Sequence, residues 1–436
     1  MTQAVVLAGG KGKRLAPILN GRPKCLVDID GTPLLQRQLE LLIANGVDDV
    51  VLLVNHEATQ VATFVEENNS FGIRISLIDD GEPRGTAGAV IATLDHLADR
   101  FLVVYGDTLM NVDLRRFIAS HEAAGSEATL FLHPNSHPSD SDLVEIGDDD
   151  WVCAFHPYPH NPAKAYANLV NAALYVIEKS ALLPWLQFKE PSDFGKDLFP
   201  AMLAAGARLK GYNSFEYIKD VGTPKRVAEA VEQLRSGVVS RASLACPQKA
   251  VFLDRDGTLN IHRGFITRPD QLELQPDAAE SVRRLNGAEF RAVLITNQPV
   301  IARGETTLDG LKEIHAKLES ELGKTGAYLD RIYFCPHHPD RGYPGEISAL
   351  KIVCNCRKPR TGMVEQAVRD LHIDLKQSWF VGDSPRDIET ASAAGMRSIL
   401  VLTGEAVAET PLKVEPNFVE NSLRDAVERI FGSDGL

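Results

Sequence analysis

The chain has 436 residues, enough for about three domains of ~150 residues each and for more than one buried core. With 44% apolar and 24% charged residues, its composition is that of an ordinary soluble protein. The net charge of -13 argues against nonspecific binding to nucleic acid or to an anionic membrane, because these polyanions would repel it.

The N-terminal residues and the hydrophobicity pattern favour a cytoplasmic protein. There is no run of ~20 apolar residues, so we expect no transmembrane helix. The apolar segment 1–10 has no charged region before it and leads directly into a basic, glycine-rich loop. We therefore do not expect it to be a signal peptide.

Strands and helices alternate along the first half of the chain. The expected elements are a strand at 4–8, a helix at 34–44, a strand at 50–54, an amphipathic stretch at 57–67, a strand at 73–78, a helix at 86–94 and a strand at 101–105. This alternation predicts βαβ units and a mostly parallel sheet.

A stretch of small residues with weak periodicity, 236–248, precedes a second alternating pattern. That pattern has strands at 250–253, 292–295, 332–334 and 379–381, and helices at 277–286, 308–322, 363–371 and 385–394. The sequence therefore predicts two doubly wound α/β domains, 1–235 and 249–436, joined by a linker at 236–248.

A glycine-rich loop follows the first strand and reads Leu-Ala-Gly-Gly-Lys-Gly-Lys-Arg-Leu. Glycines let backbone N–H groups approach a polyphosphate closely, and basic side chains add positive charge. The residues that fit this role are Gly9, Gly10, Gly12, Lys13, Arg14 and, after Pro23, Lys24. The alternative is a tight surface loop, and the Rossmann dinucleotide and Walker spacings are both absent.

The whole string, with the following Pro-Lys, resembles the signature of the sugar-1-phosphate nucleotidyltransferases. Segments 85–88, 106–107, 171–175 and 220–224 resemble further motifs of that family, in the same order. The resemblance implies a Rossmann-like nucleotidyltransferase fold over 1–235. It also implies nucleotide contacts from the glycine loop, Gly85, Thr86 and Gly88, a sugar contact from Asn171, and the Mg²⁺ ligands Asp107 and Asp220.

The reaction of that family needs no protein nucleophile. An oxygen of the sugar 1-phosphate attacks the α-phosphorus of a nucleoside triphosphate, and pyrophosphate leaves. Mg²⁺ would offset the phosphate charge, so positioning and electrostatics should dominate catalysis. One departure concerns the sugar phosphate: the family's Glu-Lys-Pro is replaced by residues 155–160, and Lys164 is the substitute cation nearest in sequence.

Two aspartates stand two residues apart at the end of the first strand of the second domain, in Asp254-Arg-Asp256-Gly-Thr. Open α/β sheets place their sites at this end of a strand. Such a pair can divide the roles of nucleophile and proton donor. A Ca²⁺ loop is the alternative, but the twelve-residue EF-hand pattern with its terminal Glu is missing.

This motif resembles that of the haloacid dehalogenase phosphatase superfamily, and Thr296–Asn297, Lys358 and Gly382–Asp383 with Asp387 match further elements in order. The resemblance implies that Asp254 forms an aspartyl-phosphate, while Asp256 protonates the leaving oxygen and then activates water. The implied phosphate-binding residues are Thr296, Asn297, Arg357 and Lys358. The implied Mg²⁺ ligands are Asp254, the backbone carbonyl of Asp256, and Asp383.

Three of the six cysteines cluster with histidines in Cys335-Pro-His337 and Cys354-Asn-Cys356. Three thiolates and one imidazole complete a closed tetrahedral zinc site. His338 is a competing ligand, and reduced surface cysteines are the alternative. The site would be structural and would position the phosphate-binding Lys358, which follows the last cysteine by two residues.

The cysteine and histidine set resembles that of the D,D-heptose 1,7-bisphosphate phosphatases and of their siblings, the histidinol-phosphatases. Family spacing favours His337 as the ligand. The long loop between the two cysteine motifs and the string Cys-x-Cys-Arg-Lys-Pro-Arg-Thr-Gly-Met favour the heptose branch. One departure is Pro299-Val300, where that family usually has Ser-Gly.

Together the resemblances imply consecutive steps of nucleotide-activated heptose synthesis for lipopolysaccharide or another cell-surface carbohydrate. GTP is the favoured nucleotide, because the first domain looks more like the guanylyltransferase that makes GDP-heptose. The implied cofactors are Mg²⁺ in both domains and Zn²⁺ in the second; no nucleic acid or membrane partner is expected. The alternatives are another sugar phosphate with CTP, UTP or dTTP, a histidinol-phosphatase-like activity, and a first domain that only senses a nucleotide sugar.

Overall fold

The computed structural model describes residues 2–55, 57–79, 81, 83–147, 149–404 and 411–435. The chain forms two compact units. The first comprises Met1–His133, Asp142–Pro157 and Val170–Ser243, and the second comprises Pro134–Ser141, Tyr158–Leu169 and Leu244–Leu436. The second unit thus takes two segments from the first half of the sequence, and the expected linker contains a short helix, α9 (Val238–Arg241).

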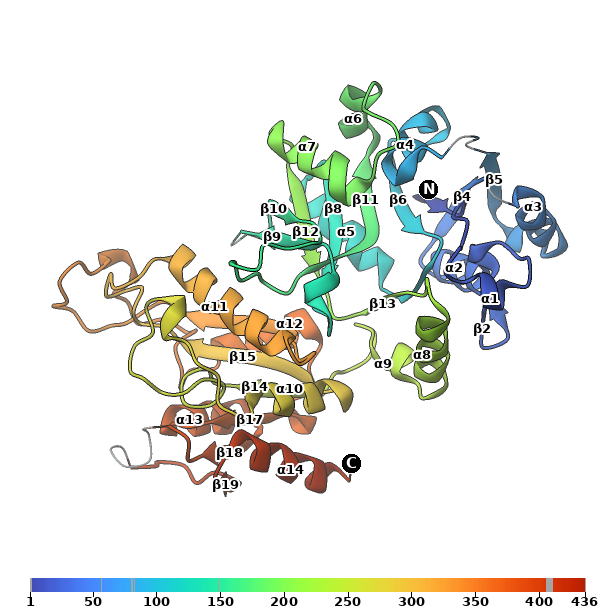
Figure 1. Cartoon of the computed structure of the whole chain (residues 1–436). Coiled ribbons are helices and arrows are strands. Elements are labelled where there is room, and N and C mark those ends of the chain that lie inside the picture. The colour runs from blue at the N-terminus through green and yellow to red at the C-terminus, as the bar shows by residue number, and fades with distance from the viewer. Residues whose placement is uncertain are drawn as a thin grey trace. The chain divides into compact units, whose positions relative to one another are not determined.

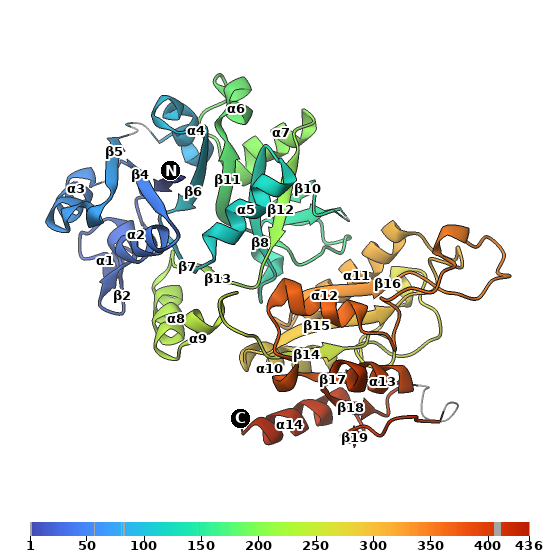
Figure 2. The same ribbon diagram turned by 180° about the vertical axis from the view of Figure 1, so that it is seen from behind.

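The first unit is built on a nine-stranded sheet in the order β10-β9-β11-β6-β1-β4-β5, with β8 pairing with β11 and β12 (Figure 1, Figure 2). Its strands are β1 (Thr2–Leu7), β4 (Val47–Val54), β5 (Arg74–Asp79), β6 (Arg100–Tyr105), β8 (Ala128–His133), β9 (Leu143–Ile146), β10 (Val152–His156), β11 (Val170–Glu178) and β12 (Leu209–Asn213). The strands β5, β4, β1 and β6 are parallel, as predicted. Strand β11 runs antiparallel to β6 and β8, so the sheet as a whole is mixed.

Shorter elements surround this sheet. A two-stranded ribbon pairs β7 (Thr108–Asn111) with β13 (Tyr217–Asp220), and another pairs β2 (Asp28–Ile29) with β3 (Thr32–Pro33). The remaining helices of the unit are α1 (Ala16–Leu19), α2 (Leu34–Ala44), α3 (Ala58–Glu67), α4 (Gly85–Ala92), α5 (Leu114–Ala124), α6 (Lys179–Leu182), α7 (Phe199–Ala204) and α8 (Pro224–Arg235).

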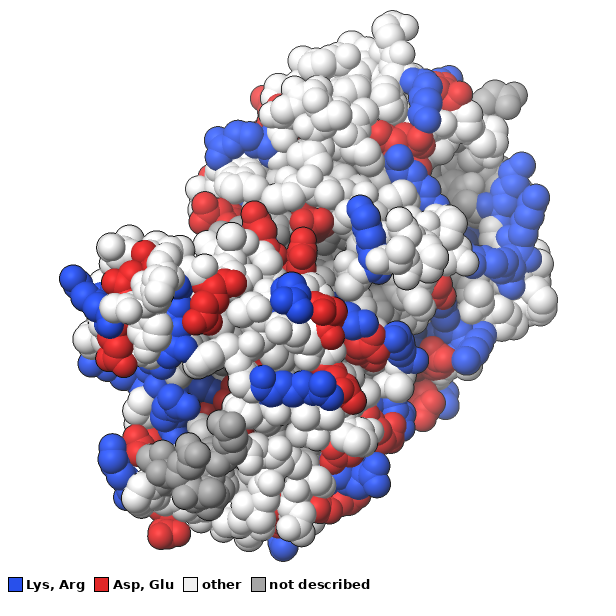
Figure 3. Space-filling view, turned by 60° about the vertical axis from the view of Figure 1, so that its left-hand side comes forward, with Lys and Arg blue, Asp and Glu red and all other residues white. Residues whose placement is uncertain are grey.

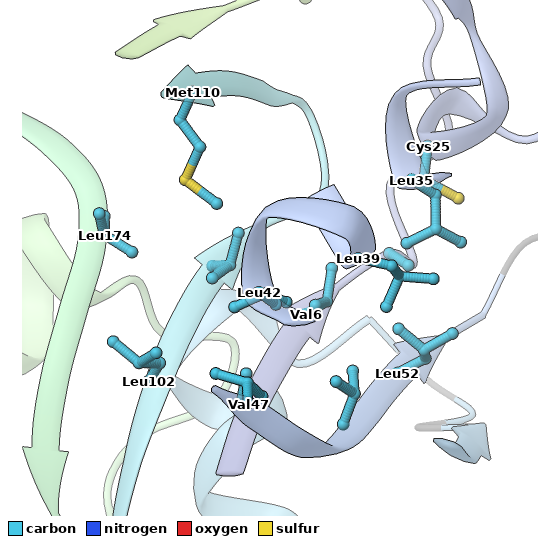
Figure 4. Packing of buried hydrophobic residues seen from close by; sticks show 14 of the residues in the cluster. Val6, Cys25, Leu35, Leu39, Leu42, Val47, Leu52, Leu102, Met110 and Leu174 are labelled. Atoms are coloured by element: carbon cyan, nitrogen blue, oxygen red, sulfur yellow. The ribbon is translucent and has the colours of Figure 1, made fainter. Parts of the chain in front are cut away.

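Helix α2 covers one face of the parallel strands (Figure 4). Its residues Leu35, Leu39 and Leu42 lie on one side of the helix and belong to the same buried cluster as Val6 and Leu52. Each leucine buried in this way contributes about 2 kcal/mol. The packing holds the strands in register, so the loops at their carboxyl ends have a rigid base.

The second unit has a six-stranded sheet in the order β16-β15-β14-β17-β18-β19, and every neighbouring pair is parallel. The strands are β14 (Ala250–Leu253), β15 (Arg291–Asn297), β16 (Arg331–Cys335), β17 (Trp379–Gly382), β18 (Arg397–Val401) and β19 (Phe418–Glu420). The helices are α10 (Ala278–Gly287), α11 (Leu308–Gly323), α12 (Gly362–Leu371), α13 (Pro385–Ala394) and α14 (Leu423–Asp434). This is the doubly wound sheet that the sequence predicts.

Alternate residues of the central strand β14 face opposite sides of this sheet. Val251 and Leu253 belong to the core that includes residues of α10, α11 and α14. Phe252, between them, stacks with Phe380 of β17 with ring centroids 6.2 Å apart. Because both faces are covered, the edge formed by the carboxyl ends of the strands is the surface left for chemistry.

Helix α11 holds the two segments that come from the first half of the sequence. The Ser320 hydroxyl accepts a hydrogen bond from the backbone N–H of Tyr166 (3.0 Å) and donates one to its carbonyl (3.1 Å). Burial raises the pKa of the nearby Glu319 to about 8, although the backbone N–H of Asn168 donates to its carboxylate and opposes this rise. The second unit is therefore assembled from discontinuous parts of the chain.

No helix among the described residues is both long and apolar enough to cross a membrane. Basic and acidic side chains are interspersed over the face in Figure 3. Exposed ion pairs of the second unit include Arg283–Glu280 on α10 and Arg268–Asp270.

Candidate active sites

Three carboxylates of the second unit meet at the carboxyl edge of its sheet. Asp254 follows β14, Asp383 follows β17, and Asp387 lies in the first turn of α13. One oxygen of each lies within 4.8 Å of the others. They come together because β14 and β17 are parallel neighbours whose carboxyl ends coincide.

Lys358 supplies the positive charge in this carboxylate cluster. Its buried Nζ lies 2.9 Å from Asp254 Oδ2 and 2.6 Å from Asp387 Oδ1. Burial raises the pKa of Asp254 to about 6, against the effect of Lys358. Burial, together with Asp254 and Asp387, raises the pKa of Asp383 to about 8. One lysine thus faces three carboxylates, and the donor set suits a hard divalent cation that would offset the remaining charge.

Asp256 lies in a different environment from Asp254. Burial alone would raise its pKa, but the Arg255 guanidinium and hydrogen bonds from Asn260 and Gln298 outweigh burial and lower it. Asn260 Nδ2 lies 3.1 Å from Asp256 Oδ1, and Gln298 Nε2 lies 3.0 Å from Oδ2. Two carboxylates in one motif therefore have opposite pKa shifts, which is the pattern expected when they perform different tasks.

The predicted phosphate-binding residues divide into two groups. Thr296 and Lys358 present polar atoms beside the aspartates, with Thr296 Oγ1 accepting a hydrogen bond from Gln298 Nε2 at 2.9 Å. The Asn297 amide instead bonds the backbone of Lys358 twice, at 3.0 and 3.1 Å. Arg357 donates to the carbonyl of His337 at 3.2 Å. Asn297 thus holds Lys358 in place.

The four predicted metal ligands Cys335, His337, Cys354 and Cys356 form one cluster. The three sulfur atoms are 3.3–3.5 Å apart, and His337 Nδ1 lies 3.2 Å from Cys356 Sγ. No disulfide links the described cysteines. The competing His338 instead accepts a hydrogen bond from the backbone N–H of Asp340 at 3.2 Å. Three thiols and one imidazole are the donor set of a closed tetrahedral metal site.

A cavity of about 460 Å³ opens at the carboxyl ends of β1, β4 and β6 in the first unit. Its size is that of a pocket for a small ligand. Six of the predicted nucleotide and metal residues line it: Gly9, Gly10, Lys24, Gly85, Thr86 and Asp107. Among the described residues, Gly12, Arg14, Gly88 and the second predicted metal ligand, Asp220, lie outside this wall.

Asp107 directly precedes β7, and Asp220 is the last residue of β13, the strand that pairs with β7. The backbone N–H of Val221 donates to the carbonyl of Asp107 at 2.9 Å. The Asp107 carboxylate pairs with Lys24, and that of Asp220 pairs with Arg226. Each predicted metal ligand therefore has a basic partner, so a phosphate or a cation entering here would change both pairs.

Comparison with known proteins identifies the first unit. A family model described as Nucleotidyl transferase matches residues 3–237, which is more than half of the chain. The chain belongs to this nucleotidyl transferase family. A second model, described as HAD-hydrolase-like, matches residues 355–426.

Curated relatives identify the second activity. The D-glycero-beta-D-manno-heptose-1,7-bisphosphate 7-phosphatase of Haemophilus ducreyi is 39% identical over 182 residues, 41% of this chain and 97% of that enzyme. The enzyme of that name from Yersinia pestis is 38% identical, covering 42% of this chain and 94% of its own. HddC from Yersinia pseudotuberculosis, a solved structure, is 25% identical over 54% of this chain and all of its own, with a TM-score of 0.46. The identity and coverage of the two phosphatase relatives show that the chain also belongs to this phosphatase family. With the family match over 3–237, it is an enzyme with a nucleotidyltransferase and a phosphatase activity.

A segment that no sequence motif predicts, Ser192–Asp193, contacts the wall of the nucleotidyltransferase cavity. Gly85 has φ +75, and a Cβ there would overlap the backbone of Ser192. Thr86 Oγ1 donates to Asp193 Oδ2 at 2.8 Å and accepts from the Tyr105 hydroxyl at 3.0 Å. Thr86 thus joins the cavity wall to residues more than a hundred positions away, and no local motif marks Ser192 or Asp193.

The two residues considered for sugar binding, Asn171 and Lys164, lie in different units. Asn171 is the second residue of β11, and its side-chain oxygen accepts a hydrogen bond from the N–H of Ala173 at 3.3 Å. Lys164 is exposed and belongs to Tyr158–Leu169, the segment that packs with the phosphatase unit. Lys164 thus belongs to a different unit from the predicted sugar contact Asn171.

Proposed function

We propose that this bifunctional enzyme catalyses two consecutive steps of nucleotide-activated heptose synthesis in the cytoplasm. The phosphatase unit would remove the 7-phosphate of D-glycero-D-manno-heptose 1,7-bisphosphate. The nucleotidyltransferase unit would then transfer GMP from GTP to heptose 1-phosphate and release pyrophosphate. The observation that carries this proposal is the presence, in one chain, of an aspartate–lysine phosphatase cluster with heptose phosphatase relatives and a glycine-lined nucleotidyltransferase cavity.

In the phosphatase unit, Asp254 is the proposed nucleophile. Its carboxylate would attack the phosphorus of the 7-phosphate while Asp256 gives a proton to the departing sugar oxygen. Asp256 would then take a proton from the water that hydrolyses the aspartyl-phosphate. Lys358 and Thr296 would hold the phosphoryl oxygens. Bound Mg²⁺, held by Asp254, Asp383 and the Asp256 carbonyl, would supply the charge compensation that lets two anions approach.

In the nucleotidyltransferase unit, Gly9 and Gly10 would present backbone N–H groups to the phosphates of the triphosphate, and Lys24 would add positive charge. Asp107 and Asp220 are the proposed Mg²⁺ ligands. The chain supplies no nucleophile, since the sugar phosphate is already ionised. Rate enhancement would come from alignment of the two substrates and from charge stabilisation.

The Cys335, His337, Cys354 and Cys356 cluster is proposed to bind a structural Zn²⁺. Removing zinc with a chelator, followed by resupply of Mg²⁺, should lower phosphatase activity by about tenfold or more, because Lys358 follows Cys356 by two residues. Pyrophosphate release should stay at its original rate. Metal content by mass spectrometry and both activities are the measurements. Loss of zinc with phosphatase folding and activity unchanged would reject this role.

The decisive experiment for the nucleotidyltransferase unit measures pyrophosphate release with Mg²⁺, heptose 1-phosphate and each of GTP, ATP, CTP, UTP and dTTP. We expect GTP to be used at least about tenfold faster than the others. A different preferred triphosphate would overturn the assignment of the base. Release with another sugar 1-phosphate but not with heptose 1-phosphate would overturn the assignment of the sugar.

A second candidate is a nucleotidyltransferase unit that binds a nucleotide sugar without turnover. The ion pairs Lys24–Asp107 and Arg226–Asp220 favour it, because they engage both proposed metal ligands. The altered Glu-Lys-Pro region favours it as well. Pyrophosphate release with none of the five triphosphates, combined with saturable binding of GDP-heptose, would establish this alternative.

A further inference from the structure

Arg255, the residue between the two motif aspartates, is completely buried and directed at Asp256. Its Nη2 lies 2.8 Å from Asp256 Oδ2 and 3.0 Å from Oδ1, and its Nε lies 3.1 Å from Oδ1. Within the described residues, Nη1 has no hydrogen-bond partner. The side-chain hydrogen bonds that the guanidinium makes to described residues all go to Asp256. Its two parallel donors fix the plane of that carboxylate more firmly than a single donor can.

Two neutral donors complete the surroundings of Asp256. A carboxylate offers about four acceptor sites. Arg255 donates to both oxygens, through Nε and Nη2 to Oδ1 and through Nη2 to Oδ2. Asn260 donates to Oδ1 as well, and Gln298 donates to Oδ2. Gln298 Nε2 also donates to Thr296 Oγ1 at 2.9 Å, so it keeps a partner if it leaves Asp256. The site on Oδ2 is therefore the one most easily given up to a substrate oxygen.

A buried histidine, His315, interacts electrostatically with both Arg255 and Asp256. His315 of α11 has its pKa lowered to about 3 by burial first and then by Arg255, against the opposing effect of Asp256. This shift disfavours a charged imidazole, and the cation in hydrogen-bond contact with Asp256 is Arg255. Truncating Arg255 would remove both the charge and the fork, whereas lysine would keep only the charge.

We propose that Arg255 is a positioning residue that holds Asp256 so that Oδ2 exchanges the proton in catalysis. This rests on the proposed phosphatase function. In the first half-reaction an Asp254 oxygen bonds to phosphorus, the ester P–O bond breaks, and the Asp256 proton passes to the leaving oxygen. In the second, water bonds to phosphorus, its proton passes to Asp256, and the Asp254–phosphorus bond breaks to release inorganic phosphate.

A double-mutant cycle in the full-length chain tests this role. Single-turnover phosphate release from heptose 1,7-bisphosphate is measured for wild type, Arg255→Met, Asp256→Asn and the double variant. Arg255→Met should be slower by about 10²-fold, and the same change should have little further effect once Asp256 is Asn. A purely structural role would give losses that multiply, and that result would overturn the proposal.

The leaving group provides a second readout. The phenolate of p-nitrophenyl phosphate departs without a proton, so its release depends less on Asp256. The Arg255→Met change should therefore slow the burst of p-nitrophenolate by a factor about ten times smaller than the factor for cleavage of the sugar phosphate. Equal slowing of both substrates would contradict the proposal. Arg255→Lys should recover part of the lost rate, and Arg283→Met, on the exposed face of α10, is the matched arginine control. Circular dichroism and pyrophosphate release report folding.

The failure of the positioning role can be told apart from the failure of the proposed function. If the wild-type chain releases no phosphate from heptose 1,7-bisphosphate in Mg²⁺, the proposed function is wrong, and the positioning role falls with it. If wild type is active and Arg255→Met matches it in kcat and KM, only the positioning role is wrong.

Discussion

Replacing Asp254 with asparagine should lower phosphate release from the sugar bisphosphate by about 10³-fold or more. An amide cannot form the aspartyl-phosphate, and no other carboxylate can occupy the same position at the end of β14. Pyrophosphate release by the nucleotidyltransferase unit should continue at the wild-type rate. The measurement is the release of phosphate and pyrophosphate by the same preparation.

The Asp254→Asn variant should also fold. Asp254 is one of three carboxylates that face Lys358, and its charge contributes to the raised pKa of Asp383, so an amide relieves repulsion. Asp309→Asn is the matched control, because that side chain is 91% exposed. A folded Asp254→Asn variant that has lost both activities would show that the two units do not work independently.

Replacing Asp107 with asparagine should lower pyrophosphate release by about 10²-fold or more. Asp107 lines the cavity and is a proposed Mg²⁺ ligand, so the amide would weaken metal binding where charge develops on the triphosphate. Phosphate release by the phosphatase unit should be unchanged. Initial rates over a range of Mg²⁺ concentrations are the measurement, and part of the loss should be recovered at high Mg²⁺.

Stability must be measured beside these rates, because Asp107→Asn leaves Lys24 without its partner carboxylate. A loss of about 1 kcal/mol is expected from this broken pair. Asp48→Asn, at an exposed position on β4, is the matched control. Full pyrophosphate release by Asp107→Asn at low Mg²⁺ would exclude Asp107 as a metal ligand.

The elements with strong local signals are predicted well by the sequence. Helices α2 and α13 and strand β14 have the predicted bounds. In α13 the reason is local: Ser384 and Asp387 form a capping box, with Pro385 in the first turn. Strands β8, β9 and β12 of the first unit escaped prediction, because they pair with partners far along the chain.

The residue types of both sites are also encoded locally. Asp254 and Asp256 share a five-residue motif, and Gly9 and Gly10 share one loop, so spacing alone places each set at the end of a strand. Cys335, His337, Cys354 and Cys356 lie in two short motifs, and their side chains form one cluster in the structure. The contacts of Asn297 with the Lys358 backbone and of Arg255 with Asp256 could not be predicted from these motifs, because a side chain's partner depends on packing.

The sequence by itself determined two α/β units, their motifs and the chemical groups available to each. The tertiary structure decided which groups meet: Asn297 with the Lys358 backbone, Arg255 with Asp256, and Tyr166 with Ser320, 154 residues later. The physical reason is that periodicity, capping and loop chemistry act over a few residues. Contacts between distant segments depend on how complete elements pack, and that packing leaves no local pattern to read.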